Sequence, residues 1–312
     1  MDKLKIGILG AGGISSRVAA GITQSYNCVL AFVGSTDRQR AKNLAEKFGV
    51  SEYGNYEELL NADIDAVYIA TINRLHYHHI KLCLANNKHV ICEKPLLSNN
   101  RELTELYKLA QERDLLLLEA MKCRYLPTVN KVKELLAAYG KPLEVTATFC
   151  RQEGALSDLH HAFYDPLYGG ALKDVGCYVI SWVLEVFPAK LVDCQLQQRF
   201  RQEVDVESWL ELRNSDGIKF SLGCAVDYDK DNQAVIQGKD YQIIVRNFWK
   251  SYDIEVWRDG KLTESYRKDL GSEFAYEVQY FAEVIEKADQ QAVDRAECDF
   301  LKRVIDLYPT SK

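Results

Sequence analysis

A glycine-rich turn near the start of the chain has the composition of a phosphate-binding site. Residues 10–15 read Gly-Ala-Gly-Gly-Ile-Ser, between the short apolar run 4–9 and a helix-compatible stretch. Without a side chain at Gly12, phosphate oxygens can approach the backbone, and the helix start offers N–H groups and a favourable dipole. The pattern predicts pyrophosphate binding by Gly10, Gly12, Gly13 and Ile14. The alternative is a glycine turn without a ligand. Ser15, at the third glycine position, predicts slightly looser packing of helix on strand.

The end of the next apolar run, 28–33, indicates which dinucleotide fits. An NAD site places Asp or Glu there to hold the ribose hydroxyls, but this chain has Gly34-Ser35-Thr36. Without a carboxylate a 2′-phosphate is not repelled, and Ser35, Thr36 and Arg38 can donate to it. We expect NADP(H), with NAD(H) as the second candidate. In the alternative interpretation Arg38 is a solvated side chain and Asp37 an N-cap.

A third candidate segment, 70–73, follows the apolar run 66–70 at the carboxyl end of a predicted strand. Open α/β sheets bind ligands at such ends, so we expect Thr71 and Asn73 to contact the cofactor. The histidines that follow, His76, His78 and His79, lack a third acidic or cysteine ligand at metal spacing. We therefore predict no metal site but a cluster on a helix surface, with His76 facing the cleft.

Two further motifs carry candidate catalytic groups. Glu93-Lys94-Pro95 follows the predicted strand 89–92, which puts the lysine beside the crevice. Residues 169–178 read Gly-Gly-Ala-Leu-Lys-Asp-Val-Gly-Cys-Tyr, so Asp174 and Tyr178 are four apart on one predicted helical face, close to a glycine pair that permits close approach. The structural alternatives are a surface lysine and a tyrosine packed in the core.

These motifs together resemble the glucose-fructose oxidoreductase, inositol dehydrogenase and rhizopine-catabolism (Gfo/Idh/MocA) family. The resemblance spans residues 4 to about 185 and rests on the glycine turn, the segment 71–73, Glu93-Lys94-Pro95 and the motif 169–178. Glu119-Ala120-Met121, Arg124-Tyr125-Leu126-Pro127 and Tyr178 look most like the branch of dimeric dihydrodiol dehydrogenases and NADP-dependent xylose dehydrogenases.

The resemblance implies a role for each matching residue. Lys94 would meet the substrate hydroxyl or carbonyl, Asp174 would position the substrate, and Tyr178 would stand where many relatives use histidine. The peptide bond Lys94-Pro95 would be cis. We also assign His76, Glu93 and Lys94 to the cofactor site. Two departures affect these expectations, since Thr36 stands where NADP-using members often have arginine and Tyr178 replaces the histidine of sugar-oxidising members.

The chemistry expected of such a site is hydride transfer between nicotinamide and a secondary alcohol or its carbonyl. The alcohol loses its O–H proton as the hydride leaves, so the site needs a proton acceptor. Free lysine and tyrosine titrate near ~10.4 and ~10, so work near neutral pH requires a drop of about three pKa units. Burial and the positive nicotinamide would lower the pKa of Lys94, and Lys94 would act as the cation beside Tyr178. We treat the two as a coupled pair, with Asp174 orienting the substrate.

The elements that must position these residues change character near residue 121. Up to about residue 120 apolar strand-like runs alternate with helical patterns, which predicts an α/β, doubly wound parallel Rossmann sheet. From Leu143 onward apolar residues alternate at period two, as in 143–149, 204–212 and 220–226, which predicts a large, mostly antiparallel open sheet in an α+β domain. We place the domains at 1–121 for dinucleotide binding and 122–312 for substrate binding and dimerisation.

Details of the second predicted domain concern its turns, its helices and its partners. Asp216-Gly217 and Asp259-Gly260 predict hairpin turns, and the helical patterns 171–187, 274–288 and 296–307 are expected to cover the sheet.

We consider Phe163 and Tyr168 as pocket walls, with ordinary packing as the alternative. We treat His160 as a loop residue and His161 as a candidate substrate contact. Trp209 and Trp257 fall on the outward face of the predicted sheet, where uncovered aromatic residues usually mean a partner. Because members of the resembled family commonly associate through this sheet, we expect a homodimer.

Composition narrows the function further. The 312 residues carry 39 Lys plus Arg against 45 Asp plus Glu, a formal charge of −6, which argues against nucleic-acid and membrane partners. Nine scattered cysteines without C-x-x-C spacing and an N-terminus without a signal-peptide core favour a reduced, cytoplasmic protein. The expected activity is that of an NAD(P)-dependent dehydrogenase acting on a polyol, sugar or cyclic vicinal diol. The alternatives are a non-catalytic NAD(P)-binding sensor and a nucleotide-binding methyl-transfer protein.

Overall fold

The chain folds into two compact units. The computed structural model describes residues 3–152 and 162–309. One unit comprises Met1–Met121 with Ser272–Ile305, and the other comprises Lys122–Gly271 with Asp306–Lys312. The first break falls at the residue where the sequence pattern changes. The segment from Ser272 to Ile305 differs from the expectation, because it returns to the first unit.

The first unit is built on a parallel sheet. Its described strands run in the order β3-β2-β1-β4-β5-β6, and every recorded pairing between them is parallel. The order reverses between β1 and β4, which makes their carboxyl ends the expected ligand position of a doubly wound fold. The strand bounds are Leu4–Leu9 (β1), Cys28–Gly34 (β2), Glu52–Gly54 (β3), Ala66–Ile69 (β4), His89–Glu93 (β5) and Leu117–Ala120 (β6).

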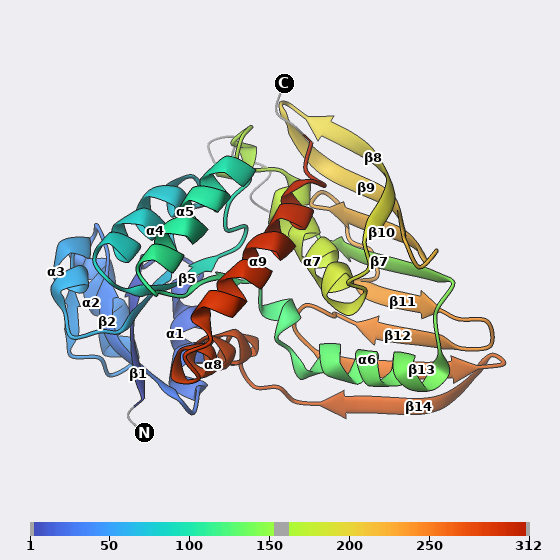
Figure 1. Cartoon of the computed structure of the whole chain (residues 1–312), viewed down its shortest axis with the longest axis horizontal. Helices are drawn as coiled ribbons and strands as arrows, with labels where there is room; N and C mark the ends of the chain where they lie inside the picture. The colour runs from blue at the N-terminus through green and yellow to red at the C-terminus, as the bar shows by residue number, and fades with distance from the viewer. Residues whose placement is uncertain (1–2, 153–161, 310–312) are drawn as a thin grey trace. The chain divides into compact units, whose positions relative to one another are not determined.

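Helices connect these strands and lie beside the sheet, as Figure 1 shows. In α2, for example, Ala41, Leu44 and Ala45 are buried, and Asp37 caps the helix start by accepting hydrogen bonds from two backbone N–H groups. The helix bounds are Ser15–Gln24 (α1), Arg38–Lys47 (α2), Tyr56–Asn61 (α3), Asn73–Leu75 (η1), His76–Ala85 (α4) and Asn100–Glu112 (α5). Asn55 and Glu58 form a capping box at the start of α3.

Two helices from the end of the chain complete the first unit, namely α8 (Glu273–Glu286) and α9 (Gln290–Ile305). Helix α8 packs on α1 so closely that a Cβ at Gly21 would lie 2.5 Å from the Cβ of Phe274. Helix α9 packs on α5 and β6, where Asp294 accepts the N–H of Leu117 at 3.0 Å. The expectation that both helices cover the second sheet was therefore wrong, because an apolar stripe does not say which sheet it meets.

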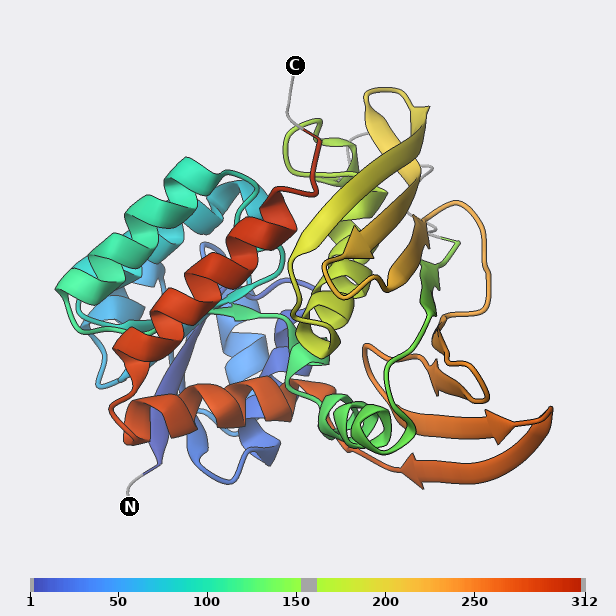
Figure 2. The ribbon, with the colours of Figure 1, turned by 45° about the vertical axis from the view of Figure 1, so that its right-hand side comes forward.

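The second unit is a large sheet with helices on one face (Figures 1 and 2). Its described strands run in the order β14-β13-β12-β11-β7-β10-β9-β8, and β7 and β10 form its parallel pair while the other recorded pairs are antiparallel. The bounds are Glu144–Cys150 (β7), Leu191–Arg201 (β8), Val204–Asn214 (β9), Lys219–Ala225 (β10), Gln233–Gln237 (β11), Gln242–Arg246 (β12), Tyr252–Arg258 (β13) and Lys261–Lys268 (β14).

Local structure in this unit both follows and departs from the sequence pattern. Gly217, Asp259 and Gly260 have positive φ at the two predicted hairpin turns. Helix α6 (Pro127–Tyr139), which the pattern analysis did not include, packs on α7 (Cys177–Val186) and on β13. The predicted helix over 171–187 is divided, because Leu172–Gly176 (η5) forms a π-helical segment before α7 begins.

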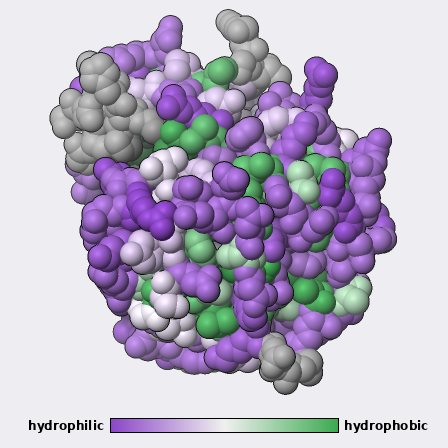
Figure 3. All heavy atoms as spheres, turned by 90° about the vertical axis from the view of Figure 1, so that its left-hand side faces the viewer, coloured by the Kyte–Doolittle hydropathy of each residue, from purple (hydrophilic) through white to green (hydrophobic). Residues whose placement is uncertain are grey.

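The exposed surface is mainly hydrophilic on the face drawn in Figure 3, as the charged composition leads us to expect. Hydrophobic residues stand there in small groups between the hydrophilic ones, as is usual for surface apolar residues. Among the described helices, none combines the length and the apolar character that crossing a membrane requires.

Candidate functional site

The glycine turn between β1 and α1 has the geometry that a pyrophosphate needs. Gly10 adopts φ +115°, and a Cβ there would lie 2.7 Å from the carbonyl oxygen of Ala70. Gly12 and Gly13 are exposed, and a Cβ at either position would meet no protein atom within 4 Å. The backbone at Gly12 and Gly13 is therefore open to a ligand, while Gly10 is fixed by the fold. Helix α1 follows these glycines, and its N-cap residue, Ile14, makes no side-chain hydrogen bond to the helix start.

Ser15 holds this turn in shape. Its hydroxyl accepts the N–H of Gly12 at 3.0 Å and donates to the carbonyl of Gly10 at 2.8 Å, and the residue is fully buried. The expected looser packing at this position is thus offset by two hydrogen bonds across the turn.

The predicted 2′-phosphate residues follow β2, and one of them already has an anionic partner. Ser35 is buried and its hydroxyl accepts the N–H of Asp37 at 3.1 Å, whereas Thr36 is exposed. Arg38 is also exposed and donates to both carboxylate oxygens of Glu58, at 3.0 and 2.9 Å. Hydrogen bonds from the backbone of Asn55 and from Arg38 lower the pKa of Glu58. A carboxylate therefore does lie in this region, on α3 instead of at the tip of β2.

The segment after β4 is tied together by two histidines. The Oγ1 of Thr71 lies 3.0 Å from Nδ1 of His79, and Nε2 of His76 lies 3.1 Å from the carbonyl oxygen of Thr71. Asn73 is half-buried at the start of η1. His76 and His79 are buried and His78 is exposed, so the three do not form the expected cluster on the helix surface.

His76 supports the candidate catalytic turn instead of facing an open cleft. It is fully buried, and its Nδ1 lies 3.0 Å from the carbonyl oxygen of Pro95 and 3.3 Å from that of Leu96. Burial lowers the pKa of His76, against the pull of these carbonyl groups. The expectation of an accessible His76 was wrong, because α4 turns this side chain toward the backbone after β5.

Lys94 lies on a turn that is fixed on both sides. It is half-buried directly after β5, and the Lys94-Pro95 peptide bond is cis, as the resemblance implied. The N–H of Leu96 donates to Oε1 of Glu119 on β6 at 2.9 Å. Preceding the lysine, Glu93 is buried and accepts the hydroxyl of Tyr68 at 2.9 Å, and Oε1 of Glu277 lies at the same distance from that hydroxyl. Neighbouring strands and α8 thus position this backbone.

In the second unit the predicted pair lies at the junction of η5 and α7. Tyr178 is 9% exposed in the first turn of α7, and its ring centroid lies 5.7 Å from that of Phe149. Asp174 is half-buried in η5, and its Oδ2 lies 3.2 Å from Nη2 of Arg151, which follows β7. Single π-helical turns are frequent at functional sites.

The glycine pair before η5 permits the close approach that we expected. A Cβ at Gly169 would lie 1.9 Å from the carbonyl oxygen of Phe163, and one at Gly170 would lie 2.0 Å from Oδ1 of Asp205. Phe163 is buried, whereas Tyr168 is half-buried. His160 and His161, the other candidates in this segment, lie outside the described residues.

Sequence analysis missed several residues of this site because they come from separate elements. Glu119 had been noted as part of a family motif, but its bond to the turn of Lys94 was not foreseen. Arg151 and Lys122 were not considered, and Glu58 was not considered as part of this site. For Lys122 one signal was available, since it directly follows the motif Glu119-Ala120-Met121.

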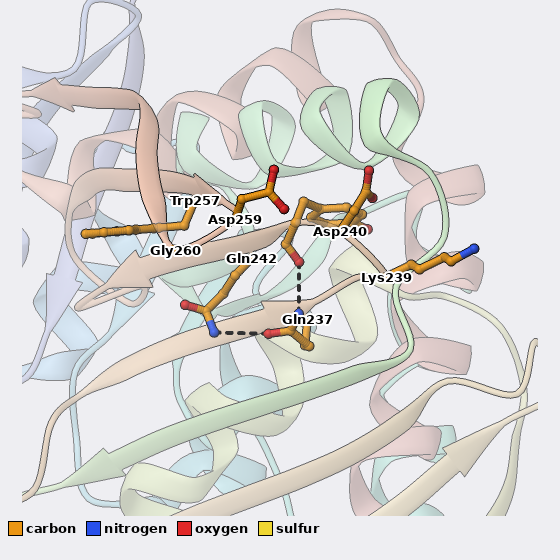
Figure 4. Close-up of a pocket in the computed structure, with 8 residues that line it drawn as sticks. Gln237, Lys239, Asp240, Gln242, Trp257, Asp259 and Gly260 are labelled. Atoms are coloured by element: carbon orange, nitrogen blue, oxygen red, sulfur yellow. Dashed lines mark hydrogen bonds between the residues drawn. The ribbon is translucent and has the colours of Figure 1, made fainter.

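A pocket of about 340 Å³ lies elsewhere in the second unit, between the tips of two hairpins (Figure 4). The hairpins are β11–β12 and β13–β14. None of the predicted site residues lines it. The lining residues are Gln237, Lys239, Asp240, Tyr241, Gln242, Trp257, Asp259 and Gly260.

A doubly wound parallel sheet whose first strand ends in an open glycine turn is the architecture of dinucleotide-binding proteins. A model of the oxidoreductase family with an NAD-binding Rossmann fold, GFO/IDH/MocA, matches residues 4–120, and the family's C-terminal domain matches residues 129–244. The chain belongs to this family.

Individual relatives agree with this membership. The chain is 31% identical over 261 residues to trans-1,2-dihydrobenzene-1,2-diol dehydrogenase of Xenopus tropicalis, covering 81% of this chain and 78% of the relative. It is 28% identical over 292 residues to an NADP(+)-dependent scyllo-inositol 2-dehydrogenase of Bacillus subtilis, covering 91% of this chain and 89% of the relative. A crystal structure of a 3-ketoreductase from Actinomadura kijaniata shares the fold, with a TM-score of 0.87 at 22% identity over 98% of this chain and 96% of that chain.

Proposed function

We propose that the chain is an NADP(H)-preferring oxidoreductase that interconverts a secondary alcohol of a sugar or cyclic vicinal diol with its carbonyl. The observation that carries the proposal is the turn of Lys94. Pro95 and Leu96, directly after the lysine, are held by His76 and Glu119, which is the kind of support a reacting side chain requires. Family membership and the named activities of the relatives support the same reaction class.

The residues of the glycine turn fit the cofactor. Gly10, Gly12, Gly13 and Ile14 would hold the pyrophosphate. Ser35, Thr36 and Arg38 would meet the 2′-phosphate, and Thr71 and Asn73 would contact the nicotinamide half. When bound, the nicotinamide accepts or supplies the hydride. Glu93 and His76 act on this site through the backbone that they hold.

We assign the proton chemistry to Lys94 and Tyr178. In the oxidative direction the alcohol proton must leave as the hydride departs, so one of these groups accepts it and the other donates a hydrogen bond to the same oxygen. Asp174, held by Arg151, would orient the substrate hydroxyls. Reduction uses the same groups in reverse, with the proton donated to the developing alkoxide.

The experiment is a substrate panel followed at 340 nm with NADP(H) and with NAD(H). It contains pentoses, hexoses, inositols and dihydrodiols, together with their carbonyl forms. We expect turnover of at least one class, with a higher kcat/KM for the NADP(H) cofactor. Binding of NADPH without turnover of any compound would favour the non-catalytic sensor instead.

We further propose that the chain forms a homodimer through the face of the second sheet opposite α6 and α7. Trp209 and Trp257 lie on this face but are half-buried, so they are less exposed than the sequence predicted. Each indole N–H donates to a glutamate, Glu207 or Glu255, at 3.0 and 3.2 Å. Light scattering should give twice the chain mass, and Trp209→Glu should reduce it to the monomer mass.

A further inference from the structure

Lys122 is a buried lysine placed against the aromatic ring of Tyr178. It begins the short helix η2 (Lys122–Arg124), and it is 5% exposed. Its Nζ lies over the Tyr178 ring, 5.4 Å from the centroid. Lysines are almost never buried to this degree unless their charge is compensated. Both residues belong to the second unit.

The rest of η2 fixes this contact. The Sγ of Cys123 donates to the carbonyl oxygen of Tyr178 at 3.7 Å, so η2 is attached to the backbone of the same tyrosine. Arg124 forms an ion pair of 3.3 Å with Glu185, further along α7. Because η2 contacts α7 at two points, the backbone that carries Lys122 is held beside Tyr178.

Several charged groups on the elements around α7 form contacts of their own. On α6, Lys133 pairs with Glu185 at 2.8 Å, and in η5 Lys173 donates to the carbonyl of Leu167. Asp174 pairs with Arg151.

Two thiols belong to strands that pack on α7, those of Cys150 on β7 and Cys224 on β10. Burial raises the pKa of both, which leaves them neutral near pH 7. They add no charge beside Tyr178 in that range.

An ammonium over a tyrosine ring changes the balance between phenol and phenolate. The ring of a phenolate carries more negative charge than that of a phenol, so the cation binds it more strongly. A nearby positive charge favours the charged form of an acid, and burial strengthens the interaction because little water screens it.

We propose that Lys122 is a positioning residue that holds the Tyr178 ring and stabilises its phenolate form. The inference rests on the proposed function in one respect, namely the assignment of proton transfer to Tyr178. It revises the sequence expectation that Lys94 supplies the cation, because the second unit carries a cation for Tyr178 of its own. Tyr178 then exchanges protons closer to neutral pH than a free tyrosine does.

The test compares Lys122→Met, which removes the charge at similar length, with Lys122→Arg, which keeps it. Lys250→Met is the matched control, because Nζ of Lys250 lies 5.6 Å from the centroid of the Trp249 ring and Lys250 is exposed. The direct readout is the ¹³Cζ signal of labelled tyrosine followed against pH, with Tyr178→Phe assigning the resonance. The second readout is the pH profile of kcat/KM.

We expect Lys122→Met to raise the apparent pKa of Tyr178 by about one unit, and Lys122→Arg and Lys250→Met to leave it near the wild-type value. The alkaline shift should appear in the pH profile too, with NADPH affinity unchanged. An identical Tyr178 titration in wild type and folded Lys122→Met would overturn the inference. So would a wild-type Tyr178 that titrates at or above ~10, which decides the matter even if Lys122→Met does not fold. If the titration shifts but the wild type turns over no panel compound, the proposed function fails and the role of Lys122 stands.

Discussion

We propose that Arg38 is the residue on which cofactor preference depends most directly. It donates twice to Glu58, and Glu58 is also the N3 residue of the capping box of α3. The guanidinium is thereby oriented before any ligand binds. Its five donors allow it to bind a phosphate while it keeps one contact to the carboxylate.

We predict that Arg38→Ala selectively weakens the binding of NADPH. The dissociation constant for NADPH should rise about tenfold and that for NADH less than about twofold, because only the former carries the 2′-phosphate that a charge-assisted hydrogen bond would reach. Fluorescence titration with both cofactors measures this. Arg40→Ala is the control, since Arg40 is equally exposed and pairs with Asp37. An equal loss for both cofactors would place Arg38 outside the 2′-phosphate site.

Single residues could be proposed for the site where a local motif or the family resemblance points to them. The glycine turn, Lys94, Asp174 and Tyr178 are such candidates, and their roles stay predictions. The contacts of Glu119 and Lys122 could not be predicted. Glu119 binds the turn after β5 and Lys122 lies against Tyr178 of α7, and the fold alone brings these elements together. His76 was placed wrongly for the same reason, since its partners, Thr71 and the turn after β5, are brought together only when β4 and β5 pair.

The turn between β1 and α1 contains a structural glycine, Gly10, and a glycine for which we propose ligand binding, Gly12. Gly10 has positive φ and faces the carbonyl of Ala70, whereas Gly12 faces open space. Gly10→Val should therefore destabilise the fold, by about 2–4 kcal/mol. Gly12→Val should leave the melting temperature nearly unchanged and weaken NADPH binding at least about tenfold, because its side chain would stand where the pyrophosphate approaches.

Thermal unfolding and NADPH fluorescence on the two variants check this pair. Normal NADPH affinity in Gly12→Val would show that this turn does not hold the pyrophosphate. An unchanged melting temperature in Gly10→Val would contradict the structural role of Gly10.

Elements with strong periodicity were predictable, and their partners were not. The alternation of strands and helices up to residue 120 predicted the parallel sheet of the first unit, and the period-two runs predicted the mostly antiparallel sheet of the second. The π-helical turn η5 has the apolar spacing of an ordinary helix, so periodicity does not distinguish the two. Helices α8 and α9 also showed their apolar stripes, but burial against α1, α5 and β6 is a long-range property.

At the scale of the whole chain, α9 attaches the C-terminal segment to the first unit through a buried acid. Asp294 is fully buried, accepts the N–H of Leu117, and burial raises its pKa to about 7. The folded chain thus binds this proton at a higher pH than the unfolded chain, in which Asp titrates near ~3.9. Its contribution to the free energy of unfolding is greatest below about pH 4 and is lost as the pH rises through about 7.

We predict that Asp294→Asn removes this pH dependence, because the amide keeps an acceptor for Leu117 and carries no charge. The difference in unfolding free energy between variant and wild type should shift by about 2–3 kcal/mol in favour of the variant between pH 5 and pH 8. Urea unfolding at the two pH values measures it. Asp299→Asn, a largely exposed position on the same helix, is the control and should show no such trend. A constant difference across the range would mean that Asp294 does not titrate there.

The measurement that bears most directly on the proposed reaction is turnover of Lys94→Met beside Lys108→Met, an exposed lysine on α5. With the compound found active in the panel, kcat/KM should fall by about a thousandfold for Lys94→Met, within the range expected when a proton-transfer group is lost. It should stay at the wild-type value for Lys108→Met, and both variants should still bind NADPH, which separates loss of the reaction from loss of the cofactor. Wild-type turnover by Lys94→Met would contradict the assignment of Lys94 to the reacting oxygen.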